Sequence, residues 1–263
     1  MKTYRKYQIK RKKSILKNRF FWLTLLFLVF VGGIFYLVYF AEFFQIKEIE
    51  ISGTQKVSNE ELKIIASGEI EKKLFLFSSR STFLVNTSKI ENLILEKFPE
   101  INKVNLKRKL PDKLFLEIEE RQPWATLTLD EKDFYYCDEN GIIFEKIEEI
   151  TPPLLKIKNL ILKEEIILGE RVIEKDLIEK IEKINTKLRE NLKIDVEEFI
   201  IPSPERLNVK TVEDWEIYFD PKGNLNWQII ELSLVLEKEI PSEKRENLEY
   251  IDLRFSKVYY KYR

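Results

Sequence analysis

The chain has 263 residues, enough for one or two domains, and its 45 basic and 45 acidic side chains cancel to zero net charge. It contains no histidine, which excludes catalysis by a serine or cysteine nucleophile paired with a histidine base. Its single cysteine, Cys137, excludes an intrachain disulfide bond. Stability must therefore come from an ordinary hydrophobic core.

The uncharged stretch at residues 20–41 is the strongest single feature of the chain. As a helix of about 22 residues it is roughly 33 Å long, enough to cross a bilayer core of about 30 Å. A buried core helix rarely runs this far without a charge, and bulky residues follow it where a signal peptide has small ones. We expect an uncleaved transmembrane helix in contact with the lipid bilayer.

The charges are distributed unevenly about this stretch. Residues 1–19 carry nine basic side chains and no acidic one, which leaves 36 basic against 45 acidic residues in 42–263, a net charge of −9. The positive-inside rule predicts a cytoplasmic tail at 1–19 and an exported C-terminal part. A nucleic-acid-binding arm is the other interpretation of the tail, and its position beside the span favours topology and lipid attraction.

The residues after the span predict a small α+β unit in the order strand, helix, helix, strand, strand. Ile49 and Ile51 alternate with charged residues in the first strand. Ser58 and Glu61 form a capping-box pattern at the start of a helix that we expect to stop at Gly68. Residues 72–85 are expected to be an irregular, serine-rich connection. The second helix starts near Thr87 and precedes strands at 101–107 and 114–118.

The remaining residues predict a second α+β region with a mainly antiparallel sheet. A hairpin turns at Asp138–Gly141, and a later helix places Leu177, Ile181, Ile184 and Leu188 on one face. Asp220-Pro221 is expected to open a last helix, with Asp220 as its N-cap. We expect strands at residues 124–129, 133–137, 142–147, 196–201, 207–212, 215–219 and near the C-terminus.

Patterns for catalysis, metals and cofactors are weak. Ser14 and Lys17 fit an S-x-x-K spacing, but the companion K-T-G motif is missing. Asp138–Gly141 lacks the alternating ligands of a calcium loop and is interpreted as a turn. Glu117 and Glu119 alternate with apolar residues as the solvated face of a sheet does. We predict no catalytic, cofactor or metal site, no nucleic-acid partner and no small-molecule substrate.

Several motifs resemble the FtsQ/DivIB family of bacterial cell-division proteins. They are Ile51-Ser-Gly53, Phe98-Pro99-Glu100-Ile101, Arg108-Lys-Leu110-Pro111, the Glu120-Arg121-Gln122-Pro123 ending and Tyr250-Ile-Asp-Leu-Arg-Phe255. The resemblance implies a cytoplasmic tail at 1–19, a transmembrane helix at 20–41, a POTRA domain at 43–122 and an FtsQ/DivIB-type domain at 123–263. It also implies a single-pass, non-enzymatic scaffold of the divisome, in the cell membrane at the division septum.

The resemblance further implies a partner site near the C-terminus. Members of this family bind FtsB/DivIC-like and FtsL-like bitopic proteins, and the matching positions here are Arg254, Phe255, Ser256, Lys257, Val258 and Tyr259. The alternative without a binding function is that residues 258–262 form a fully paired last strand or a frayed terminus. We expect an edge strand that accepts a partner strand by β-augmentation.

Two other functions remain open from the sequence. A POTRA-bearing export or envelope-assembly factor is disfavoured because too few residues remain for a barrel. A membrane-anchored cell-wall hydrolase is disfavoured because the catalytic groups it needs are not apparent.

Overall fold

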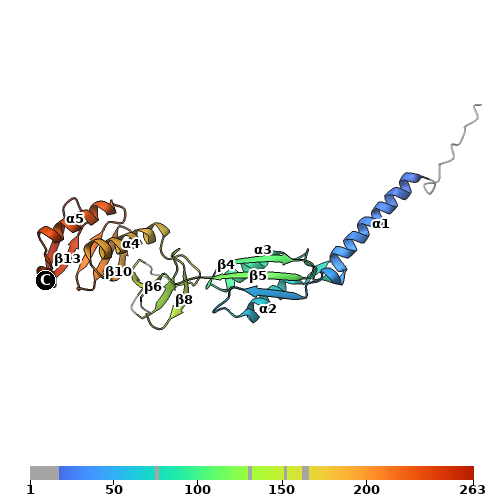
Figure 1. Ribbon diagram of the computed structural model, residues 1–263, viewed down its shortest axis with the longest axis horizontal. Coiled ribbons are helices and arrows are strands. Elements are labelled where there is room, and N and C mark those ends of the chain that lie inside the picture. Colours follow the sequence, from blue (N-terminus) through green and yellow to red (C-terminus); the bar gives the residue numbers. More distant parts are fainter. Residues whose placement is uncertain (1–17, 75–76, 130–131, 151–152, 162–165) are drawn as a thin grey trace, which may run out of the picture. The chain divides into compact units, whose positions relative to one another are not determined.

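The computed structural model of this chain describes residues 18–74, 77–129, 132–150, 153–161 and 166–263 (Figure 1). The chain forms two compact units. The first consists of Met1–Ser52, Ser58–Asn92 and Asn105–Glu117, and the second of Gly53–Val57, Leu93–Val104 and Ile118–Arg263. The domain boundaries predicted after residues 42 and 122 stay predictions. The S-x-x-K motif and nearly all of the basic tail lie outside the described residues.

The predicted apolar helix is present as α1, Arg19–Phe40. The side chain of Asn18 caps its N-terminus by accepting a hydrogen bond from the amide of Phe20 at 3.0 Å. No residue of α1 is buried by protein, and α1 is the one helix in the described part of the chain long and apolar enough to span a membrane. Its carbonyls before the last turn are satisfied within the helix, as a lipid environment requires.

A three-stranded sheet and two helices follow in the predicted order. The elements are β1 (Glu48–Ser52), α2 (Asn59–Ile70), α3 (Thr87–Lys97), β4 (Ile101–Lys109) and β5 (Lys113–Glu120). The strand order is β1-β5-β4, and β1 lies parallel to β5 with Ile51 opposite Leu116. Leu114 and Leu116 are fully buried while Glu117 is exposed, so one face of the sheet carries the core. The α+β class is confirmed.

Three local predictions for this region are wrong. Ser58 makes no capping bond to the helix, because its hydroxyl lies 3.1 Å from a carboxylate oxygen of Glu60 and bonds there instead. Helix α2 continues two residues past Gly68 to Ile70. The side chain of Ile70 is fully buried, and this apolar burial stabilises the longer helix. The connection at 72–85 is not irregular throughout, because β2 (Lys72–Leu74) and β3 (Phe77–Ser79) pair as an antiparallel hairpin.

The second sheet has nine strands in the order β14-β13-β12-β11-β10-β9-β6-β7-β8. Five of its eight pairings are antiparallel, as predicted, and three are parallel. The strands are β6 (Ala125–Thr128), β7 (Phe134–Cys137), β8 (Ile143–Ile147), β9 (Leu155–Asn159), β10 (Val196–Ser203), β11 (Arg206–Thr211), β12 (Glu216–Phe219), β13 (Leu248–Asp252) and β14 (Tyr259–Tyr262).

Helices α4 (Lys175–Lys187) and α5 (Leu225–Lys238) lie side by side over this sheet (Figure 1). Short helical turns occur at Leu188–Leu192 and Ser242–Asn247. The core between helices and sheet contains fully buried Trp215, Phe199 and Phe219. Its position leaves the opposite sheet face to polar and aromatic side chains.

Two predictions in this unit need correction. The last helix begins at Leu225 with Asn224 as N-cap, not at Asp220-Pro221. Asp220 instead accepts a hydrogen bond from the amide of Lys222 at 2.8 Å, which closes a turn over residues 220–222. On α4 and the turn after it, Ile181, Ile184 and Leu188 are buried as predicted, but Leu177 is only half-buried, and the neighbouring Ile178 is buried instead.

Candidate interaction site

Strand β14 is at one end of the nine-stranded sheet, so one of its backbone edges has no neighbouring strand in the described part of the chain. Its four residues are exposed, and its three tyrosines range from 37% for Tyr262 to 55% for Tyr259. It pairs antiparallel with β13, with Tyr259 opposite Asp252 and Lys261 opposite Tyr250. An exposed, aromatic edge strand of this kind is a template for pairing with another chain.

A hydrogen bond directly after β14 shows which of its backbone groups face outward. The amide of Arg263 donates to the carbonyl of Asn247 at 2.8 Å, so residue 263 points toward the β13 side. Backbone direction alternates along a strand, so Tyr259 and Lys261 also point toward β13, and Tyr260 and Tyr262 point away. The N–H and C=O groups of Tyr260 and Tyr262 are therefore the ones placed to pair with an added strand.

The six residues predicted as partner contacts lie next to each other but not all in a strand. Arg254–Val258 form the bend that connects β13 to β14, and Tyr259 is the first residue of β14. Phe255 is 56% exposed and its ring meets Tyr259 edge-on, with ring centroids 5.8 Å apart. The structure places this pair at the start of the free edge.

Arg254 is held in place by Asp252. Its Nε and a terminal nitrogen lie 2.9 and 2.6 Å from the two carboxylate oxygens, a two-point contact that raises the pKa of Arg254. Asp252 is nearly buried, so the guanidinium has one preferred direction. Arg254 therefore presents its face to the aromatic residues around it rather than moving freely in solvent.

An aromatic and basic ladder next to the bend was missed by the sequence reasoning. Tyr218 lies under two guanidinium groups, that of Arg206 at 4.0 Å and that of Arg254 at 5.6 Å from the ring centroid. The ring of Tyr250 stacks on Tyr218 at 5.0 Å. Burial raises the pKa of Tyr218, and these side chains connect the consecutive strands β11 and β12 to the later strand β13.

Strand β14 is also attached through its side chains. The hydroxyl of Tyr260 donates to Glu239 at the end of α5, which raises the pKa of Tyr260. Lys261 pairs with Glu249 at 2.6 Å, which raises the pKa of Lys261. These contacts fix the position of the strand while its outer backbone edge remains accessible.

The Asp138–Gly141 segment is a structural turn, as predicted. One carboxylate oxygen of Asp138 accepts hydrogen bonds from the amides of Asn140 and Ile142, both at 2.9 Å, and the other pairs with Arg121 at 2.6 Å. Gly141 has φ +78°, and a Cβ there would lie 1.9 Å from a backbone oxygen. The carboxylate is thus occupied by protein donors.

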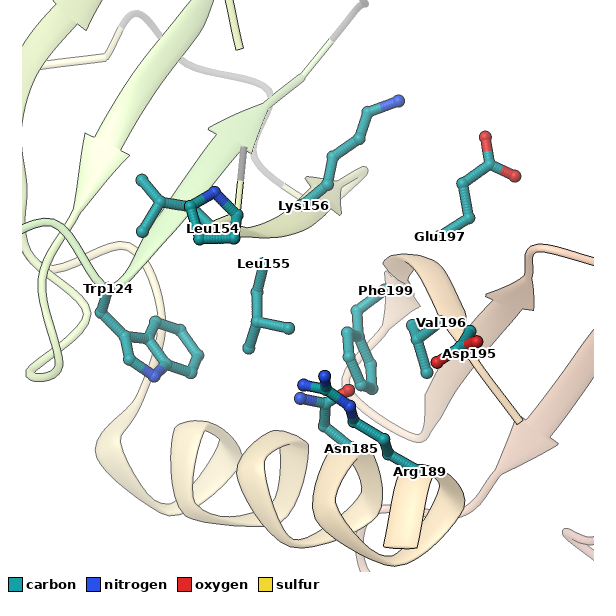
Figure 2. Close-up of a pocket in the computed structure, with 11 residues that line it drawn as sticks. Trp124, Leu154, Leu155, Lys156, Asn185, Arg189, Asp195, Val196, Glu197 and Phe199 are labelled. Carbon is teal, nitrogen blue, oxygen red and sulfur yellow. The ribbon is translucent and has the colours of Figure 1, made fainter. Parts of the chain in front are cut away.

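A pocket of about 380 Å³ lies between α4 and strands β9 and β10 (Figure 2). Figure 2 shows Arg189 and Asn185 on its helical side and Lys156 on the opposite side. The acidic Glu197 at its rim is exposed and pairs with Lys210 at 3.0 Å, as solvated surface residues do. No group of three or more metal-ligating side chains occurs among the described residues.

Comparison with protein families identifies the class of the first folded region. Residues 44–121 match the FtsQ-type POTRA domain. This span contains β1, α2, α3, β4 and β5, so the predicted βααββ order and the predicted domain type are both confirmed. The chain contains an FtsQ-type POTRA domain after an apolar N-terminal helix.

Relatives of the chain carry two related names. It is 30% identical over 138 residues to "Cell division protein DivIB" of Clostridium tetani, covering 52% of this chain and 48% of that protein. It is 28% identical over 153 residues to a DivIB of Clostridium botulinum (58% and 54%), and 23% identical over 113 residues to "Cell division protein FtsQ" of Syntrophotalea carbinolica (43% and 36%). The matches span about half the length of the DivIB relatives.

Proposed function

We propose that this chain is a DivIB/FtsQ-type cell-division protein that acts as a non-enzymatic membrane scaffold. The observation that carries the proposal is the exposed edge of β14 beside the Arg254–Val258 bend, in a chain with an FtsQ-type POTRA domain. The similarity to proteins named Cell division protein DivIB and FtsQ supports the process in which it acts.

The proposed mechanism is strand addition on a membrane-confined scaffold. Helix α1 anchors the chain in the cell membrane with the basic tail in the cytoplasm, and the folded units are exported. FtsB/DivIC-like and FtsL-like bitopic partners are confined to the same membrane, which raises their effective concentration near the site. A partner strand then pairs with the outward backbone groups of Tyr260 and Tyr262, flanked by Phe255 and Tyr259.

Truncation tests this function. Removing residues 255–263 deletes β14 and most of the bend, and we expect co-purification of the bitopic partners from solubilised membranes to be lost. Alanine at Ile64, an exposed residue of α2 (70%), is the matched surface control and keeps co-purification. Circular dichroism of both variants shows whether the rest of the fold is retained. Undiminished co-purification after truncation would contradict a site at β14.

A further inference from the structure

The last turn of α1 is hydrogen-bonded to side chains from two later segments of the first unit. The hydroxyl of Ser81 donates to the carbonyl of Val38 at 2.6 Å, and that of Ser79 to the carbonyl of Tyr39 at 2.5 Å. The side-chain amide of Gln45 also donates to Tyr39, at 3.1 Å. The terminal carbonyls of a helix need partners outside it, and here side-chain donors supply them.

The same segments are joined to each other directly after the helix. The backbone amide and hydroxyl of Thr82 both donate to the carbonyl of Phe44, at 2.9 and 3.0 Å. The amide of Arg80 donates to the side-chain oxygen of Gln45 at 2.7 Å, and Gln45 and Ser81 form a β-bridge. Residues 79–83 are therefore fixed to the end of α1. We call the hydrogen bonds that join residues 79–82 and Gln45 to residues 38–45 the clamp.

Three phenylalanines are held at this position by the clamp. The ring of Phe44 meets Phe43 and Phe83 edge-on, at centroid distances of 5.0 and 5.2 Å. Phe43 is 64% and Phe83 43% exposed, and the exposed Arg80 lies between the two clamp serines. Apolar rings next to a cation match the mixed chemistry of a lipid headgroup region, where acyl chains meet phosphates.

The length of α1 places these rings at that depth. Its 22 residues at about 1.5 Å each span roughly 33 Å, little more than the hydrocarbon core, so the helix ends near the headgroups. Phe43 follows the last helical residue by three positions and therefore lies within about 10 Å of the helix end. The polar headgroup layer is roughly 5–8 Å thick on each side.

We propose that Phe43, Phe44 and Phe83 form a membrane-contact surface that seats the POTRA domain in the outer headgroup layer, with Ser79 and Ser81 as positioning residues. The occupant is the lipid bilayer, because the surface is continuous with the end of the proposed membrane span. The inference rests on α1 crossing the membrane, which belongs to the proposed function. It adds a second contact between the chain and the bilayer, outside the span.

Nitroxide labels in lipid nanodiscs test this on the full chain. Cysteine is introduced at Phe83, at Ile64 as an exposed control in the same unit, and at Val29 within α1. Burial raises the pKa of the Cys137 thiol to about 12, so the native cysteine stays unlabelled. The measurement is the ratio of label collisions with oxygen, which concentrates in lipid, to collisions with a water-soluble nickel chelate.

We expect this ratio to be several-fold higher at position 83 than at position 64, and highest at position 29. Ser79→Ala combined with Ser81→Ala should lower the ratio at 83 toward that at 64 and leave positions 29 and 64 unchanged. Equal ratios at 83 and 64, with 29 lipid-buried, would overturn the contact surface while the span stands. A water-accessible label at 29 would overturn the span and this inference together.

Discussion

Replacing Tyr260 by proline tests the direction assigned to the backbone of β14. The N–H of Tyr260 points away from β13, so proline there removes no hydrogen bond of the folded chain, and proline is tolerated at such edge positions. The same N–H is one of the donors offered to a partner strand. Tyr260→Pro should therefore leave the sheet intact and weaken partner binding.

The magnitude follows from the lost pairing. A ladder hydrogen bond contributes about 0.5–1.5 kcal/mol, and a carbonyl of the partner left without a donor costs about 1–3 kcal/mol. Together these give a loss of about 1.5–4.5 kcal/mol, or roughly 10- to 2,000-fold in Kd. Tyr260→Ala is the matched control, because it loses the same side chain and its bond to Glu239 but keeps the N–H.

The assay is an affinity titration of the detergent-solubilised chain with a DivIC-like partner, with urea unfolding of each variant followed by tryptophan fluorescence. The expected result is weak binding for Tyr260→Pro, near-normal binding for Tyr260→Ala, and similar unfolding midpoints for both. Equal Kd values for the two variants would refute the backbone-pairing argument. Lys261→Pro should differ from both by destabilising the fold, because its N–H faces β13.

Two further predictions concern ion pairs. Arg121→Met should lower the free energy of unfolding by about 3 kcal/mol, because it leaves the carboxylate of Asp138 buried without its cation; a urea-unfolding loss below about 1 kcal/mol would contradict this. Hydrogen bonds from Lys109 and Lys113 lower the pKa of Glu50 to about 2, so its stabilising effect is complete above pH 4.5 and is lost as pH falls toward 2. An NMR titration of the side-chain carboxyl carbon of Glu50 should show the lowered pKa, and Lys109→Met should raise it. An ordinary pKa for Glu50 in the unmodified chain would contradict the prediction.

Much of the fold could be predicted because its signals are local. The uncharged stretch, the periodic apolar faces and the strand alternation each depend on neighbouring residues, and α1, α3, β4 and β5 lie where those patterns indicate. The positions at which helices start were harder to predict, because several neighbouring polar residues can each act as the N-cap. Asn224 caps α5 although Asp220-Pro221 has the stronger local pattern.

The candidate site was only partly predictable. The resemblance directed attention to Arg254–Tyr259, but the direction of each backbone group depends on the pairing of β13 with β14. Arg206 and Tyr218 come from β11 and β12, and no spacing in the sequence shows that Arg206 and Arg254 both lie over the ring of Tyr218. The hairpin β2–β3 was missed because its strands are only three residues long.

The location of the protein in dividing cells tests the proposed function most directly. A fluorescent protein fused to the N-terminus, on the proposed cytoplasmic side, reports that location through the cell cycle. A band at midcell that appears before constriction is the result predicted for a DivIB/FtsQ-type scaffold. An even distribution around the envelope, unchanged during division, would contradict it and favour a POTRA-bearing export or envelope-assembly factor.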